Sequence, residues 1–286
     1  MNPPHFAWLN GVITPLAEAR VSVLDRGFLF GDGVYEMVPV YSKKPFRLDD
    51  HLNRLEASLT AVRLPYPLTR AAWRDAIADL IARHEWQDQS VYLQITRGVA
   101  TRDHVFPVPT VPTVFMTVLP LTMASAADKA RGVCAISVPD QRWGRCDVKS
   151  LNLLANVLAR QQADDAGCVE AVQFDNGWLT EGTASTIVVV RDGGLIVPPA
   201  SPKLLPGVTC EVVLELAAAH GIPFARRPVD EAGVRTADEL WMASSTREIM
   251  PIVRLDGAPV GAGVPGPLAV RMDALYQRYK DEVMRA

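Results

Sequence analysis

Lys149 is the first residue whose type and setting could do chemistry. It lies in the segment Asp147–Asn152, directly before a predicted helical face formed by Leu151, Leu154 and Leu158. A lysine at a strand-to-helix junction can point into a site at the helix N-terminus, where burial lowers its pKa and frees the amine to form a Schiff base. Taken alone, a lysine at such a position is more often solvated.

Glu181 belongs to a second candidate segment, Thr180–Thr186, which follows a predicted hairpin and precedes the aliphatic run Ile187–Val190. A carboxylate followed by glycine and small hydroxyl residues could face the nitrogen of a ring and leave space for that ring. The alternative is a strand-end turn with threonine and serine at the surface.

Two further stretches combine small and hydroxyl residues, Leu205–Thr209 at a predicted helix start and Ser244–Thr246. The free N–H groups and the dipole at a helix N-terminus favour a phosphate. Neither stretch is a Walker loop, which argues against a nucleotide triphosphatase.

Arg102 and His104 stand two residues apart in a predicted loop after Arg97 and Gly98, so both could point at one anion. Arginine binds a carboxylate through two parallel hydrogen bonds. A solvated loop and a nucleic-acid face are the alternatives, and the second is disfavoured because no aromatic platform or basic surplus accompanies the pair. The five histidines lack metal-ligand spacing, so no metal site is expected.

The elements that must position these residues alternate between strands and helices. Leu52, Leu55, Leu59 and Val62 mark one helix, with Asp49 and Asp50 as caps and Pro65 as its stop. Thr69 is predicted to cap the next helix. Other elements are expected as strands at 91–96, 114–119, 133–138, 169–174, 187–190, 195–197 and 240–243, and helices at 150–165, 208–220 and 268–283.

A small, polar and aperiodic segment at 121–129 indicates a linker between two domains. We expect an N-terminal α/β domain over 1–120 and a larger, strand-rich domain over 130–286 that contains Lys149. The predicted fold class is therefore α+β, with a small N-terminal α/β sandwich and a C-terminal barrel-like domain.

Composition excludes several classes of protein. Hydrophobic residues make up 49% of the 286 residues, enough for a full core and too many for a disordered chain. A net charge of -3 gives no basic field for nucleic acid, and no apolar run approaches the ~20 residues of a membrane span. Residues 1–9 lack the features of a signal peptide, and the four cysteines are scattered, so a reducing cytoplasm is expected.

Together these segments resemble one family, the class IV (fold-type IV) pyridoxal-phosphate aminotransferases, and within it the D-amino-acid aminotransferases most closely. The matching stretches run in family order through nearly the whole chain. They are Asp25–Glu36, His51–Leu55, Arg97-Gly98 with Arg102 and His104, Arg145–Asn152, Thr180–Gly182 and Ser245-Thr246.

The resemblance implies a role for each matching residue and pyridoxal 5'-phosphate as cofactor. Lys149 would attach the cofactor covalently and act as the general base, and Glu181 would pair with the ring nitrogen. The phosphate would be bound by Arg54, Val208, Thr209, Ser245 and Thr246, and Leu205 would support the ring. Tyr35, Arg102 and His104 would bind the substrate α-carboxylate.

The implied reaction is transfer of an amino group between D-amino acids, such as D-alanine or D-glutamate, and 2-oxo acids. It would pass through pyridoxamine phosphate with ping-pong kinetics. The loop bearing Arg102 and His104 would reach over from the neighbouring subunit, which implies a homodimer with a shared active site.

The sequence departs from the D-amino-acid enzymes at three positions. Ala184 and Thr186 stand where these enzymes often have serine and asparagine, and Pro206 stands where some have lysine. The differences at Ala184 and Thr186 concern hydrogen bonds to the cofactor, and the difference at Pro206 concerns the wall of the pocket. Branched-chain aminotransferase, (R)-amine transaminase and aminodeoxychorismate lyase share the fold and stay open as alternatives, as does a non-catalytic binding protein or an unrelated hydrolase.

Overall fold

The computed structural model describes residues 5–285, which form two compact units. The first comprises the chain up to Thr122 together with Val148–Asn152. The second comprises Met123–Asp147 and the chain from Leu153 onward. None of the helices within the described residues has both the length and the apolar character that a membrane span needs.

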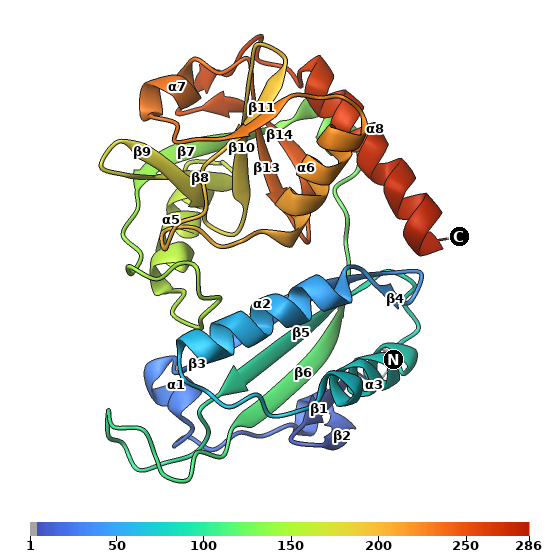
Figure 1. The fold of residues 1–286 in the computed structure, drawn as a ribbon, viewed down its shortest axis with the longest axis vertical. Coiled ribbons are helices and arrows are strands. Elements are labelled where there is room, and N and C mark those ends of the chain that lie inside the picture. Colours follow the sequence, from blue (N-terminus) through green and yellow to red (C-terminus); the bar gives the residue numbers. More distant parts are fainter. Residues whose placement is uncertain (1–4, 286) are drawn as a thin grey trace. The chain divides into compact units, whose positions relative to one another are not determined.

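The first unit is built on a six-stranded antiparallel sheet with strand order β2-β1-β6-β5-β3-β4 (Figure 1). Alternating side chains of its central strands point to opposite faces. Val91, Leu93 and Ile95 point to the face that the helices cover, and each is at most 1% exposed. The strands are β1 (Phe6–Leu9), β2 (Val12–Pro15), β3 (Gly33–Tyr41), β4 (Lys44–Pro45), β5 (Gln89–Thr96) and β6 (Thr113–Pro120).

Two long helices, α2 (Leu48–Ala61) and α3 (Arg70–Ala82), pack on this sheet. Thr69 caps α3 as predicted, because its hydroxyl accepts a hydrogen bond from Ala72 N. The expected caps of α2 were wrong: Arg47 takes the N-cap position, and Asp49 and Asp50 lie in the first turn. There their charges favour the positive end of the helix dipole. The short elements are η1 (Leu16–Glu18) and α1 (Arg26–Phe30).

The second unit contains a nine-stranded mixed sheet with order β12-β11-β10-β13-β14-β7-β8-β9, and β15 pairs with β14. β9 also approaches β10, so the sheet curls toward a half-barrel. Its interior is apolar, with Ile187, Leu240 and Ile252 at most 2% exposed. The strands are β7 (Val133–Pro139), β8 (Glu170–Asp175), β9 (Trp178–Gly182), β10 (Thr186–Arg191), β11 (Gly194–Val197), β12 (Phe224–Arg226), β13 (Glu239–Ser244), β14 (Glu248–Leu255) and β15 (Ala258–Pro259).

Helices cover this sheet: α5 packs on β7 and β8, while α6 packs on β13 and on α8. The helices are α4 (Ala126–Arg131), α5 (Leu154–Asp165), α6 (Val208–Ala219), α7 (Glu231–Arg235) and α8 (Pro267–Lys280), followed by η2 (Asp281–Arg285). The α+β fold class, with a small α/β sandwich and a larger strand-rich half-barrel, is confirmed.

The structure differs from the expected organisation at two places. α4 (Ala126–Arg131) begins inside the expected linker 121–129 and continues past its end, and Ser125 caps it through a hydrogen bond from Asp128 N. Lys149 was expected in the second domain, yet Val148–Asn152 packs with the first unit. The cause is backbone pairing with β3, through the Val34–Ser150 bridge and a 3.0 Å hydrogen bond from Leu151 N to Gly33 O.

Candidate active site

Lys149 lies in an extended segment that the first unit fixes through its backbone. Its carbonyl accepts a 3.0 Å hydrogen bond from Tyr35 N, and its own N–H donates to Ser58 Oγ of α2 at 3.2 Å. The segment thus joins β3 on one side and α2 on the other. This pairing also explains why the helix expected from residue 150 begins only at Leu154.

The amine of Lys149 lies over an aromatic ring of the adjacent strand. Its Nζ is 4.2 Å from the centroid of the Tyr35 ring, within the range of a cation–π contact. Tyr35 in turn packs against Tyr92 of β5, with ring centroids 5.9 Å apart. Burial, with a smaller contribution from Tyr35, raises the pKa of Tyr92 to about 12, so this neighbour keeps its proton at neutral pH.

Arg54, expected at the cofactor phosphate, belongs to a buried cluster with Glu36 and His51. Its Nε and Nη2 each donate to the Glu36 carboxylate at 2.8 Å, and His51 Nδ1 lies 2.9 Å from the same carboxylate. Burial raises the pKa of Glu36, but Arg54 and His51 together lower it well below its usual range. The cluster therefore pairs a fixed anion with a fixed cation.

His51 completes this cluster. Burial lowers its pKa, and the charges of Arg54 and Lys149 lower it further, against the raising effect of Glu36. Its Nε2 is buried and has no hydrogen-bond partner among the described residues. The sequence indicated only Arg54, although Glu36 and His51 end and begin two of the matching motifs.

Arg102 and His104 project from the loop between β5 and β6 and are exposed. Both lie against Phe30 of α1: the Arg102 guanidinium is 5.3 Å from the ring centroid, and the His104 ring is 5.4 Å away. Tyr35, the third residue expected at the substrate carboxylate, contacts Tyr92 and Lys149 instead. Within one chain, Arg102 and His104 therefore contact Phe30, whereas Tyr35 contacts Tyr92 and Lys149.

Glu181 lies on β9 of the second unit and is 7% exposed. Arg142 donates to its Oε1, and the backbone N–H of Leu205 donates to its Oε2 at 3.1 Å. Arg142 also donates to Asp140 at 2.6 Å. Burial lowers the pKa of Arg142, but Asp140 and Glu181 raise it to a net value above the usual one. Glu181 is thus held beside a permanent cation, which sequence reasoning missed.

A second carboxylate, Glu170, orders the turn that follows Glu181. It is 2% exposed and accepts hydrogen bonds from Thr183 N at 2.9 Å and from Ser185 Oγ at 2.7 Å. Gly182 is required in this turn, since a Cβ there would lie 2.3 Å from Ser185 Oγ. Two of the positions that depart from the D-amino-acid enzymes lie in or next to this turn. Ala184 is exposed, and Thr186 faces Gly207.

Of the residues expected at a phosphate, Arg54 lies in the first unit, and the others lie at or near the start of α6 in the second unit. Gly207 is its N-cap and has no side chain that could bond the first N–H groups, which belong to Val208 and Thr209. A Cβ on Gly207 would lie 2.6 Å from Thr186 Oγ1, and Thr186 pairs with Ala243 just before the turn that carries Ser245 and Thr246. The second unit therefore brings Leu205, the α6 N-terminus and the end of β13 into one neighbourhood.

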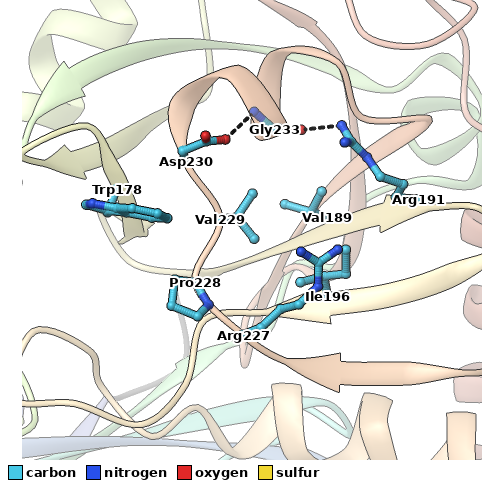
Figure 2. A pocket seen from close by; sticks show the side chains of 9 residues that line it. All are labelled: Trp178, Val189, Arg191, Ile196, Arg227, Pro228, Val229, Asp230 and Gly233. Carbon is cyan, nitrogen blue, oxygen red and sulfur yellow. Dashed lines mark hydrogen bonds between the residues drawn. The ribbon is translucent and has the colours of Figure 1, made fainter.

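A separate cavity of about 270 Å³ opens in the second unit (Figure 2). Arg191 on its wall donates hydrogen bonds to Gly233 O at 3.0 Å and to Thr236 Oγ1 at 2.6 Å. None of the residues predicted for the site lines it. Its lining consists of Trp178, Val189, Arg191, Ile196, Arg227, Pro228, Val229, Asp230 and Gly233.

Comparison with known proteins identifies the family. The family model for amino-transferase class IV matches residues 33–255. The chain belongs to the class IV aminotransferases. D-alanine aminotransferase of Bacillus licheniformis is 34% identical over 94% of both chains, and that of Listeria monocytogenes is 36% identical over 97% of this chain and 96% of the relative.

Solved structures of this class have the same fold. The branched-chain amino acid aminotransferase of Escherichia coli is 25% identical, with a TM-score of 0.89 over 96% of this chain and 94% of that one. Another branched-chain amino acid aminotransferase, solved with pyridoxamine 5'-phosphate, has a TM-score of 0.88 and 25% identity, and covers 96% of this chain and 93% of that one. The cofactor of this class IV aminotransferase is pyridoxal 5'-phosphate.

The side chains of this aminotransferase fit that cofactor chemically. Lys149 offers the amine, Glu181 an anionic acceptor for a protonated ring nitrogen, and the uncapped start of α6 a set of N–H donors for a phosphate. His51 Nε2 is a buried polar atom without a partner in the described structure. The donor set therefore matches an aldehyde, a pyridine ring and a phosphate.

Proposed function

We propose that this aminotransferase moves the amino group of D-amino acids to 2-oxo acids. The relatives at 34–36% identity, which it matches over 94% or more of its length, are D-alanine aminotransferases. The observation that supports the substrate class is the Arg102–His104 pair, two groups that can bind a carboxylate, exposed together on one loop.

In this proposal Lys149 has two roles, as the point of cofactor attachment and as the base for the Cα proton. The bound cofactor supplies the electron sink that stabilises negative charge at Cα. The backbone bonds to Tyr35 and Ser58 fix the start of the Lys149 side chain, so its amine returns to the same place. Glu181, with Arg142 behind it, holds the ring nitrogen protonated.

The phosphate is assigned to Arg54, Val208, Thr209, Ser245 and Thr246, with Leu205 supporting the ring. The Arg54 guanidinium donates to the Glu36 carboxylate from Nε and from Nη2. This pairing fixes the orientation of the side chain.

We assign the substrate α-carboxylate to Tyr35, Arg102 and His104, with the loop donated by the second subunit of a homodimer. The exposed apolar side chains on this loop and on α1 support an interface: Phe28 is 76% exposed, Val105 74% and Val108 95%. Several large exposed apolar side chains on elements that contact each other are typical of a protein contact. We place the enzyme in the cytoplasm, where its four free thiols stay reduced.

The proposal is tested with a substrate panel of D-alanine, D-glutamate, L-leucine and (R)-1-phenylethylamine. We expect turnover of D-alanine with 2-oxoglutarate as the amino acceptor, and of D-glutamate with pyruvate as the acceptor. The solved neighbours make the branched-chain L-amino acids the second candidate, and a preference for L-leucine would select it. Repeated release of pyruvate from aminodeoxychorismate without any amino acceptor would indicate a lyase.

The cofactor assignment has a chemical test. Borohydride reduction followed by peptide mapping is expected to leave a pyridoxyl group on Lys149, and Lys149→Ala is expected to lose both the yellow absorbance and turnover. A label on Lys43, Lys129 or Lys203 would overturn the assignment.

The shared site is tested by co-expressing Arg102→Ala with Lys149→Ala. A mixed dimer then contains one site with Lys149 from one subunit and Arg102 from the other. Activity above that of either variant alone is expected, and its absence would show that each loop serves its own subunit.

A further inference from the structure

A buried arginine, Arg26 of α1, binds the backbone of the loop that carries Arg102 and His104. Arg26 is 3% exposed, and its guanidinium donates to three consecutive carbonyls of the loop. Nη1 donates to Asp103 O and to Val105 O at 3.4 Å, and Nη2 donates to His104 O at 3.4 Å. Arg26 thus contacts the backbone on both sides of His104 and directly after Arg102.

Asp32 fixes this guanidinium and links it to the base of the loop. Its carboxylate accepts from Arg26 Nε at 2.8 Å and from Arg97 Nε at 2.9 Å. Arg97 is buried, donates to Val62 O and Arg63 O, and lies 3.6 Å from the ring centroid of Phe106. Two cations therefore share one anion, and each of them also binds or packs against the loop.

The two ends of the loop are also closely apposed. Gly98 has φ +83°, and a Cβ there would lie 1.9 Å from Val111 O. Arg26 N donates to Gly98 O at 2.9 Å. On the outer side, Phe30 of the same short helix lies 4.9 Å from the Arg26 guanidinium and also contacts Arg102 and His104.

From this geometry we propose that Arg26 is a positioning residue for recognition of the substrate carboxylate, acting through Arg102 and His104. The inference rests on the proposed function, which assigns those two residues to the carboxylate. Arg26 donates to three consecutive carbonyls and to Asp32, which uses the planar five-donor guanidinium. Lysine keeps the charge, but its ammonium has only three donors and no planar fork. Arg26 matched the family motif in the sequence but had no role assigned to it.

The test is a double-mutant cycle with D-alanine and 2-oxoglutarate in the full-length holoenzyme. Arg26→Lys and Arg26→Gln are each expected to raise KM for both substrates about tenfold or more, with kcat changed much less. In an Arg102→Ala/His104→Ala background, adding Arg26→Lys is expected to raise KM no further, because its effect passes through the two missing side chains.

Arg70→Gln on α3 is the matched control, since it removes an arginine that pairs with Glu56 at the surface of the same unit. Its KM is expected to stay at the wild-type value. Arg26→Lys keeps a cation beside Asp32, so the KM measurement can still be made with this variant if Arg26→Gln does not fold. Unchanged KM in folded Arg26→Lys, or an additive effect in the cycle, would overturn the proposal.

The cycle also separates failure of this inference from failure of the proposed function. If Arg102→Ala/His104→Ala itself leaves KM for D-alanine unchanged, the carboxylate assignment is wrong. If that double variant raises KM while both Arg26 variants do not, the assignment holds and Arg26 has no positioning role.

Discussion

Glu181 is an anion with one fixed partner on each oxygen. Arg142 Nη1 donates to Oε1, and Leu205 N donates to Oε2. The Nη2 atom of Arg142 forms an ion pair with Asp140. This arrangement suits an acceptor that must stay charged while a ring N–H approaches it.

Glu181→Gln tests that role, because it keeps the shape and removes the charge. We expect the D-alanine half-reaction to slow by roughly tenfold or more, since a charge-assisted hydrogen bond contributes about 1.5–3 kcal/mol. The cofactor should stay attached through Lys149. Stopped-flow absorbance measures the half-reaction, and the visible spectrum measures retention. A half-reaction at the wild-type rate would show that Glu181 does not serve the ring nitrogen.

For single residues, the sequence indicates those that belong to family motifs. It does not indicate the residues that position them through hydrogen bonds. Lys149 and Glu181 stand in short segments that match the family motifs, and the joint resemblance, not either segment alone, indicated their roles. Arg142 reaches Glu181 across 39 positions of chain, and Arg26 reaches His104 across 78. Such contacts depend on how strands pair, and no local pattern predicts them.

At the scale of elements, local periodicity predicted most strands and helices, and tertiary pairing moved the boundaries. The stripe of Leu151, Leu154 and Leu158 suggested a helix from residue 150. Ser150 and Leu151 instead pair with β3, so α5 begins at Leu154, which is 72% exposed. A hydrophobic stripe shows that residues share a helix face, but not what covers that face.

The start of α6 offers a test of the phosphate assignment. Gly207 has φ −80°, which alanine adopts readily, so only the Cβ itself is at issue. That Cβ would lie 2.6 Å from Thr186 Oγ1. Gly207→Ala is therefore expected to displace the helix start, weaken cofactor binding about tenfold and destabilise the protein by about 1–3 kcal/mol. Equilibrium dialysis and thermal unfolding measure the two effects.

Two variants make this result specific. Adding Thr186→Ala removes the clashing hydroxyl and should restore cofactor binding to Gly207→Ala. Gly144→Ala is the matched control, because a Cβ there meets no atom within 4 Å. If Gly207→Ala retains cofactor as the wild type does, the N-terminus of α6 is not the phosphate site.

For the whole molecule, acid sensitivity is set by buried carboxylates in both units. In the first, Glu36 pairs with Arg54, and its pKa is well below its usual range. In the second, Glu248 is 1% exposed and accepts from Lys129 at 2.9 Å, from Gln277 and from Lys280. Burial raises the pKa of Glu248, but the two lysines lower it to a net value below 4.5.

A carboxylate whose folded pKa is depressed stabilises the protein fully above its unfolded pKa, and this stability is lost as pH falls through the folded pKa. We therefore expect Glu248→Gln to reduce the free energy of unfolding by about 3 kcal/mol at pH 7, because it removes the carboxylate that the buried Lys280 shares with Lys129. As pH falls below about 4.5 and toward the lowered folded pKa of Glu248, the wild type progressively loses this contribution, so the difference between the two proteins should shrink. Urea unfolding at pH 7, 5 and 3 measures this difference, with the exposed Glu85→Gln as the matched control that stays near wild type. A difference between wild type and Glu248→Gln that stays constant from pH 7 to 3 would mean that the ion pairs of Glu248 do not govern acid stability.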